Sequence, residues 1–434
     1  MARLQEDLYG VLTGDDEGRV CRDIPEAACD EQPGNFSAHL FSLALTKIGD
    51  GLSDPKIILA WLLQALGAPA FMAGFLVPIR EAGALLPQLF IAAYIRSLRR
   101  RKFVWAAGSA VQGAAVLGMG VSGLFLKGAW AGISILVLLA VFALARSACS
   151  VAYKDVLGKT VTKSARGTVT GTANSLAAGA VLLFGVALAS GFLERSFTAV
   201  LGALFLAGLL WLTAAITFLR LKEVPGASEG GRNAFDVALS QIGLLKSDAP
   251  LRQFILARAF LMASALSPPF LLMLAPEEGE TFGALGAFIS ASALAGFLSS
   301  YVWGRLSDRS SRKVLFLAGL LTALSLGLAY AAHTYGHVLG DTGFLLPFWL
   351  FVLMIAHQGV RLGRSTHIVD MANEETRAAY TALSNTIIGL LLAAGGVFGL
   401  LAAIAGPAAV VLIFALMGAA GALSALRMKE VQRD

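Results

Sequence analysis

Apolar residues of this chain fall into long blocks that short polar connections separate. The blocks cover residues 38–65, 69–95, 103–126, 129–152, 168–192, 197–221, 251–275, 281–304, 312–333, 344–369, 380–404 and 408–426. Most blocks reach the ~20 residues that a helix needs to cross about 30 Å of hydrocarbon. The pattern therefore predicts an all-α polytopic membrane protein with twelve transmembrane helices.

The longest polar connection divides the twelve blocks into two sets of six. It contains the Gly/Ser-rich stretch EVPGASEGGRN, typical of a flexible linker, and then FDVALSQIGLL, which predicts a short amphipathic helix on the membrane surface. The expected domains are an N-terminal segment, a six-helix bundle, a linker, a second six-helix bundle and a tail, at residues 1–36, 37–221, 222–250, 251–427 and 428–434.

Charge indicates orientation rather than a nucleic-acid partner. Lys and Arg gather in the connections after the second, fourth, sixth and eighth blocks, so the positive-inside rule places both termini in the cytoplasm. Hydrophobic residues make up 57% of the chain and the net charge is +6, which this topology explains. We expect a multi-pass protein of a bacterial-style cytoplasmic membrane. Cys21, Cys29 and Cys149 show neither disulfide-framework nor zinc-site spacing and are expected to remain free thiols.

Ionisable residues lie inside the first two apolar blocks. Lys47, Asp50 and Asp54 share an arc of about 60° on one helix face, and Arg80 and Glu81 follow in the second block. A charge at the bilayer centre costs at least ~2.5 kcal/mol, so such residues normally face a water-filled cavity or a partner. The three carboxylates are the candidates for proton coupling. A structural ion pair between helices is the alternative for each of them.

Proline residues accompany these charges. Asp54-Pro55 is expected to break the first helix locally. Pro78 and Pro87 bracket the charges of the second block and free backbone groups there.

Cations outnumber carboxylates among the deep charges. The candidate substrate-binding residues are Lys47, Arg80, Arg146, Arg258, His357, Arg361, Arg364, Asn174 and Asn385. Six of them are cationic against three carboxylates, and an excess of cations in a low-dielectric cavity favours an anionic substrate. Arg146, Arg361 and Arg364 also lie near cytoplasmic helix ends, where snorkelling to the surface is the alternative reading.

The two halves of the chain are related to each other. An offset of 211 residues places Lys47 on Arg258, Arg166 on Arg377 and Asn174 on Asn385, and a local offset of 215 places Arg146 on Arg361 and Asp155 on Asp370. Two parallel six-helix repeats around a midplane site are the architecture of many secondary transporters.

One cytoplasmic loop carries a recognisable signature. In GRLSDRSSRK, residues 304–313, the matching positions are Gly304, Leu306, Asp308, Arg309, Arg312 and Lys313, whereas Ser311 replaces a glycine. The loop resembles the signature of the major facilitator superfamily. Its first-half counterpart, AYIRSLRRRK, keeps only the basic part.

The resemblance implies a fold of two pseudo-symmetric six-helix bundles and a latch between cytoplasmic helix ends. The implied latch residues are Asp308, Arg309, Arg312, Asp155, Arg166, Asp370 and Arg377. Ordinary topology charges that cap helix ends are the alternative. The Lys47 and Arg258 pair is similar to the paired cations of organophosphate antiporters of that superfamily, which is an analogy at the level of the fold.

The sequence therefore predicts a secondary transporter that moves a small anionic or polar solute by alternating access, with protons as the driving ion. A multidrug exporter of the same fold and a non-transporting membrane sensor are the alternatives. No enzyme is expected, because the spans show no nucleophile-base pair or metal triad. No cofactor, metal or nucleic acid is expected, and the expected partners are the solute, protons and lipid, with the protein acting as a monomer.

Overall fold

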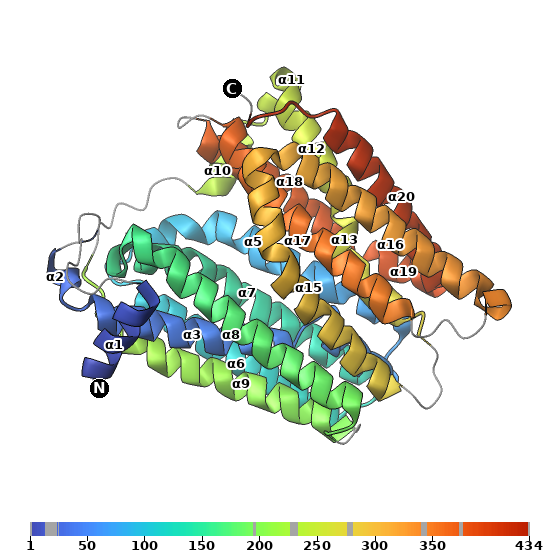
Figure 1. The fold of residues 1–434 in the computed structure, drawn as a ribbon, viewed down its shortest axis with the longest axis horizontal. Coiled ribbons are helices and arrows are strands. Elements are labelled where there is room, and N and C mark those ends of the chain that lie inside the picture. Colours follow the sequence, from blue (N-terminus) through green and yellow to red (C-terminus); the bar gives the residue numbers. More distant parts are fainter. Residues whose placement is uncertain are drawn as a thin grey trace.

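The computed structural model describes residues 2–13, 24, 26–193, 197–225, 233–275, 281–339, 345–372 and 376–432. Among these residues the regular elements are all helices (Figure 1). Two bundles form a V in this view. The N-terminal bundle is blue to green and the C-terminal bundle is yellow to red.

The N-terminal bundle holds six spans. Its elements are α3 (Gln32–Leu52), α4 (Ile58–Ala65), η1 (Ala70–Met72), α5 (Ala73–Ser97), α6 (Lys102–Phe125), α7 (Gly128–Thr160), α8 (Lys163–Ser190) and α9 (Phe197–Leu219). The first span is α3 followed by α4, and η1 leads into the second.

The C-terminal bundle repeats this plan. Its elements are α12 (Ala249–Leu261), α13 (Ala263–Leu266), α14 (Pro268–Leu272), α15 (Thr281–Arg309), α16 (Ser311–Leu339), α17 (Leu345–Met371), α18 (Arg377–Ala394), α19 (Val397–Ala405) and α20 (Pro407–Leu426). The seventh span comprises α12 to α14, and the eleventh comprises α18 and α19.

Twelve spans agree with the prediction once two irregular helices are counted. Ten helices of the described residues are long and apolar enough to cross a membrane, and the bent helix α15, with 43° between its two parts, makes an eleventh. The twelfth is the divided first span. Its break lies at Asp54-Pro55, as expected, since α3 ends at Leu52 and α4 begins at Ile58. In contrast, α5 continues through Pro78 and Pro87.

Helix packing follows one pattern in both halves. Within the N-terminal bundle α6 packs on α7 and α9, and α3 packs on α8 and α9. The equivalent helices of the C-terminal bundle repeat these contacts, with α16 on α17 and α20, and α12 on α18 and α20. Between the bundles α5 packs on α18 and α8 packs on α15, which are again equivalent pairs. The contacts therefore show the pseudo-two-fold relation that the offset of 211 residues predicts.

Glycines let the two bundles approach closely at one end. A Cβ added to Gly286 of α15 would lie 2.4 Å from the Ala189 nitrogen of α8, and a Cβ on Gly74 of α5 would lie 2.3 Å from the Gly399 Cα of α19. At the opposite ends of the same helices the space is open: added Cβ atoms on Gly167 and Gly304 would meet nothing within 4 Å. The bundles are therefore closed at one end and apart at the other.

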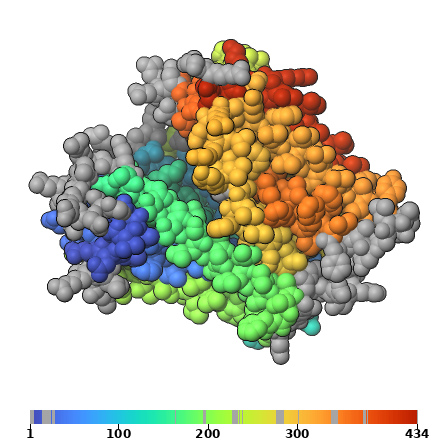
Figure 2. All heavy atoms as spheres, viewed as in Figure 1, coloured from blue at the N-terminus to red at the C-terminus, as the bar shows by residue number. Residues whose placement is uncertain are grey.

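The open end is the one where the linker and the basic connections lie. Figure 2 shows a hollow there between the two bundles. The positive-inside rule predicts that this end faces the cytoplasm, and with that orientation the conformation would be inward-facing.

The linker forms two short helices, α10 (Ala234–Ser240) and α11 (Leu244–Ser247), instead of one amphipathic helix. The prediction of a helix resting on the membrane surface is wrong for α10, which packs on α18 and α5. The Phe235 and Phe90 rings lie 4.5 Å apart, and the Asn233 side chain accepts a hydrogen bond from the Ala93 amide. The linker thus joins both bundles at the open end of the cavity.

The N-terminal segment folds onto the first bundle. Helix α1 (Ala2–Thr13) packs on α3 and α8, and the short α2 (Glu26–Cys29) precedes the first span. Cys29 is disulfide-bonded, so the prediction of a free thiol is wrong there. Cys21 lies outside the described residues, and Cys149 is a buried free thiol.

Candidate functional site

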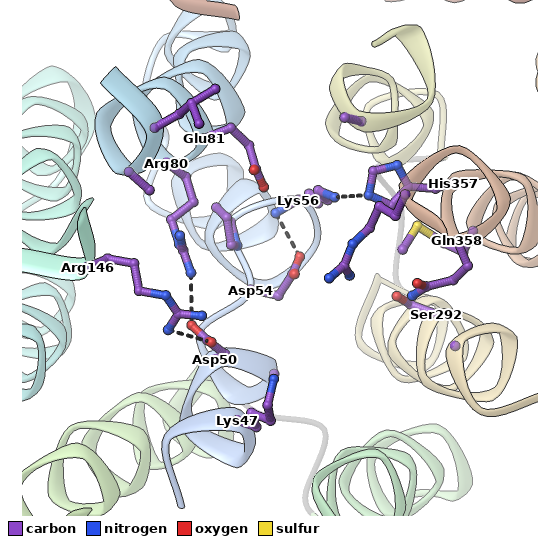
Figure 3. A pocket seen from close by; sticks show the side chains of 18 of the residues that line it. Lys47, Asp50, Asp54, Lys56, Arg80, Glu81, Arg146, Ser292, His357 and Gln358 are labelled. Carbon is purple, nitrogen blue, oxygen red and sulfur yellow. Dashed lines mark hydrogen bonds and ion pairs between the residues drawn. The ribbon is translucent and has the colours of Figure 1, made fainter. Parts of the chain in front are cut away.

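A cavity of about 970 Å³ lies between the two bundles. All twelve residues predicted to bind substrate or couple protons line it, and they come from both halves. They are Lys47, Asp50, Asp54, Arg80, Glu81, Arg146, Asn174, Arg258, His357, Arg361, Arg364 and Asn385. Figure 3 shows several of these side chains pointing into one space.

Asp50 is held between two arginines. Its Oδ1 lies 3.0 Å from Arg80 Nη2, and its Oδ2 lies 2.9 Å from Arg146 Nη1 (Figure 3). The two guanidiniums also lie over aromatic rings, Arg80 over Phe142 and Arg146 over Trp211. Side-chain exposures of 15–28% show that water still reaches this triad. The arrangement ties α3, α5 and α7 together, as the alternative of a structural ion pair predicts.

Asp54 stabilises the break in the first span. Its Oδ1 accepts hydrogen bonds from the backbone nitrogens of Lys56, at 2.8 Å, and Ile57, at 3.1 Å. These donors precede the first turn of α4, where a helix leaves backbone N–H groups without partners. The carboxylate therefore stabilises the turn that leads into α4 at the cavity wall.

Lys56 connects the two halves and is not among the residues that the sequence predicted for the site. Its Nζ lies 3.1 Å from His357 Nε2 of α17, and the other ring nitrogen of His357 lies 3.2 Å from the Ser264 hydroxyl (Figure 3). Lys56 and His357 are 8% and 9% exposed. A lysine directly after a predicted helix break is the signal that could have identified it.

Glu81 is the remaining carboxylate of the cavity. Figure 3 shows it directed toward the region of Lys56. It interacts electrostatically with Lys56, Arg80, Arg361 and Arg364, but it forms no hydrogen bond or ion pair shorter than 4 Å with any described residue. Of the three candidate proton carriers, it is the one without a direct polar contact in the described part of the chain.

Arg258 is the most buried cation of the C-terminal half, with 6% exposure. It donates hydrogen bonds to the Ser384 hydroxyl and, at 3.3 Å, to Asn385 Oδ1. The equivalent pair of the N-terminal half, Lys47 and Asn174, lines the cavity without such a bond, since no described residue forms a hydrogen bond or ion pair with Lys47. The two halves therefore place these pairs at equivalent positions but give them different contacts.

The cavity is strongly positive. Its cationic lining residues are Lys47, Lys56, Arg80, Arg146, Lys154, Arg258, Arg361 and Arg364. Against these eight stand the three carboxylates, which leaves an excess of five positive charges with His357 neutral. Lys56 and Lys154 add to the six cations that the sequence predicted.

Latch candidates make their contacts within their own half in this conformation. Asp155 pairs with Arg101 and, at 2.6 Å, with Lys159. Arg166 donates to the Val161 and Gly158 carbonyls at 2.9 and 2.8 Å.

In the second half, Asp370 accepts from Gln432 at 2.6 Å, and Arg312 lies 3.6 Å from Glu430 of the tail. Asp308 and Arg309 are exposed, and neither forms a hydrogen bond or ion pair with a described residue. The side chain of Arg377 lies outside the described residues.

Comparison with known proteins agrees with this architecture. The model of the Major Facilitator Superfamily matches residues 259–433, which run from the seventh span to the tail. No curated protein matches the chain by sequence.

Solved structures of transporters share the fold over 90–93% of this chain. A mutant of the nucleoside transporter NupG has a TM-score of 0.67 at 15% identity, with 91% of this chain and 100% of NupG covered. A POT family transporter in complex with a thioalcohol-conjugated peptide has a TM-score of 0.65 at 12% identity, with 93% and 97% covered. The xylose transporter XylE from E. coli, in a partially occluded inward-open conformation, has a TM-score of 0.63 at 10% identity, with 90% and 98% covered.

The apolar helices and the fold define a multi-pass membrane protein whose architecture is similar to that of the solved transporters. The chain is a protein of the major facilitator fold, and the resemblance predicted from its loop signature is confirmed.

Proposed function

We propose that the protein is a secondary transporter that moves a small anionic solute across the cytoplasmic membrane by alternating access. The observation that carries the proposal is the excess of five positive charges in a cavity between two symmetric bundles. A solute that enters such a cavity is attracted by cations whose field water screens only in part.

The multidrug exporter is the weaker alternative on this evidence. A lipophilic cation would meet eight cationic side chains around it. Like charges in a partly desolvated site repel each other, so the lining disfavours such a substrate. A non-transporting sensor would bind a solute in the cavity, but its two bundles would not alternate between opening at one end and opening at the other.

Proton coupling is assigned to Glu81 in this proposal. Asp50 forms ion pairs with two guanidiniums, and Asp54 accepts backbone hydrogen bonds at the break before α4. Both carboxylates therefore have structural contacts in this conformation. Glu81 interacts electrostatically with Lys56 and with Arg361 and Arg364 of α17, so gain or loss of its charge changes the field of the cavity.

Latch residues act in the opposite conformation in this proposal. Asp308 is exposed and forms no polar contact with a described residue in the state seen here. It becomes engaged when the cytoplasmic ends of the bundles approach each other. Asp308→Asn then shifts the balance toward the inward-facing state, which increased cytoplasmic labelling of a cysteine placed in the cavity would detect.

Transport into liposomes tests the proposal. Purified protein is reconstituted, and uptake is measured for a panel of small phosphates, carboxylates, sugars and lipophilic cations, with and without an imposed pH gradient. We expect uptake of an anion, accumulation that depends on the gradient, and weaker affinity in Lys47→Gln and Arg258→Gln. Uptake of sugars or lipophilic cations only would contradict the anion assignment, and binding without uptake would favour the sensor.

A further inference from the structure

The two walls of the cavity differ in their charges. All three carboxylates come from the N-terminal half, from α3, the α3–α4 break and α5. The C-terminal half contributes Arg258, Arg361 and Arg364, and its lining includes no carboxylate among the described residues. The C-terminal wall is therefore the purely cationic one.

Arg258 is buried without a counter-charge. A guanidinium has five N–H donors, and two hydrogen bonds go to neutral partners, Ser384 and Asn385. Its Nε is buried and has no hydrogen-bond acceptor in the structure. A buried charge without a partner is strongly unfavourable, so the site is built for an anion that arrives from outside the chain.

Arg361 and Arg364 belong to the same cluster. They are three residues apart on α17, which places them within about 60° of each other and about 4.5 Å apart along the helix axis. No described residue forms an ion pair or hydrogen bond with either of them, although both line the cavity. Arg364 interacts electrostatically with Arg258 and with Arg361, so it links the three positive charges of this wall.

We propose that Arg258, Arg361 and Arg364 form a subsite for one compact group that carries two negative charges. The inference rests on the proposed function and specifies its substrate class. Glu81 is the carboxylate that acts on Arg361 and Arg364 from the opposite wall. Glu81 also acts on Lys56 and Arg80, so it offsets at most one of the three guanidinium charges. At least two positive charges therefore remain on this wall, which one dianionic group neutralises.

The closeness of the cluster favours one group over two separated carboxylates. Guanidiniums bind tetrahedral oxyanions through pairs of parallel N–H donors, and such a group offers several oxygens to more than one guanidinium at once. A dicarboxylate would place its second charge away from the cluster, toward the Asp50 triad, where the arginines already have a carboxylate.

Binding of simple anions to the purified full-length protein tests the inference. Sulfate, inorganic phosphate, succinate and acetate are titrated at constant ionic strength, with thermal stability and calorimetry as readouts. We expect sulfate and phosphate to bind, and acetate to have no effect. Phosphate affinity should rise from about pH 6 to about pH 8 as the dianion becomes the main species, whereas sulfate affinity should not. If the affinities for sulfate and phosphate differ at pH 8, the difference shows which oxyanion the subsite prefers.

Substitutions locate the site. Arg258→Gln, Arg361→Gln and Arg364→Gln should each weaken sulfate binding by about tenfold or more, since each removes charge-assisted hydrogen bonds. Arg364→Lys keeps the positive charge but loses the paired N–H donors of the guanidinium, so it should weaken sulfate binding by an intermediate amount. This conservative change also provides a folded variant. Arg305→Gln, on the exposed face of α15 outside the cavity lining, is the matched control and should bind as the parent does.

The outcomes separate this inference from the proposed function. Anion uptake that depends on Arg80 and Arg146 but not on the three C-terminal arginines would overturn the subsite and leave the transporter proposal standing. Equal affinities for acetate and sulfate would overturn the double charge. Equal stabilisation of the parent and every variant, Arg305→Gln included, would mean a general salt effect and would also overturn the subsite. Uptake of uncharged solutes only would overturn both proposals.

Discussion

Replacement of Asp50 by asparagine tests the charge balance of the N-terminal wall. Asn keeps the size of the side chain and removes the one carboxylate that Arg80 and Arg146 share. Both guanidiniums then lose the carboxylate with which they are directly paired. We expect a loss of folding free energy, because removing one partner of a buried ion pair leaves the other charge desolvated.

The size of the loss follows from the distances and exposures. Unit charges about 3 Å apart attract by ~5 kcal/mol at an effective dielectric constant of about 20. The desolvation of three charges offsets much of this attraction, and exposures of 15–28% let water screen the rest. A fully buried pair loses about 3–5 kcal/mol when broken, so we expect about 2–3 kcal/mol here.

Unfolding of the purified protein in mixed micelles of increasing SDS content measures this loss. Asp308→Asn is the matched control, since that carboxylate is exposed and forms no polar contact with a described residue. Asp50→Asn with Arg146→Gln should be more stable than Asp50→Asn alone, because the second change removes the uncompensated cation. An Asp50→Asn variant as stable as the control, or additive losses in the double variant, would refute the reasoning.

Three further predictions concern coupling, closure and the inter-bundle contact. Glu81→Gln should abolish uphill transport in liposomes while anion exchange continues, whereas Asp54→Asn, which keeps the capping oxygen, should retain both; the reverse result would move the proton to Asp54. Gly286→Val should prevent α15 from approaching α8 and expose the external end of the cavity to periplasmic cysteine labelling, because even its Cβ would lie 2.4 Å from a backbone nitrogen; unchanged labelling would contradict the inward-facing interpretation. Lys56→Met should remove the bridge to His357 and speed exchange between the two conformations in single-molecule distance measurements, and unchanged rates would show that the bridge is not a barrier.

The sequence by itself determined the architecture, because the bilayer imposes a strong and local rule. Each span must satisfy its backbone hydrogen bonds within itself and bury about 20 apolar residues, so hydropathy alone locates the helices. Internal repetition then predicted the pairing of Lys47 with Arg258, since equivalent positions in two repeats occupy equivalent places. The break at Asp54 also followed from local chemistry, because a proline removes a donor at a known position.

Candidate residues for the cavity were also predictable as a set. Charges inside apolar spans are expensive unless they reach water or a partner, and the twelve predicted residues do line one cavity. The contacts of each residue were not predictable, because a partner on another helix depends on how the bundles pack. Asp50 meets Arg80 and Arg146 from two different helices, although Lys47 is its neighbour on the same helix face and Asp54 follows it in the break.

Only the tertiary structure showed that Asp50 and Asp54 have structural contacts, whereas Glu81 has no direct polar contact with a described residue. Only the tertiary structure revealed the role of Lys56. The sequence shows a lysine directly after a predicted helix break, but its partner appears only when α17 brings His357 within 3.1 Å from the other half. The asymmetry between the two walls also comes from the packing of neighbouring helices. Arg258 donates a hydrogen bond to Asn385, whereas Lys47 at the equivalent position has no such bond. Repetition determines where side chains lie, whereas the packing of neighbouring helices decides which of their charges are neutralised and which remain for a ligand.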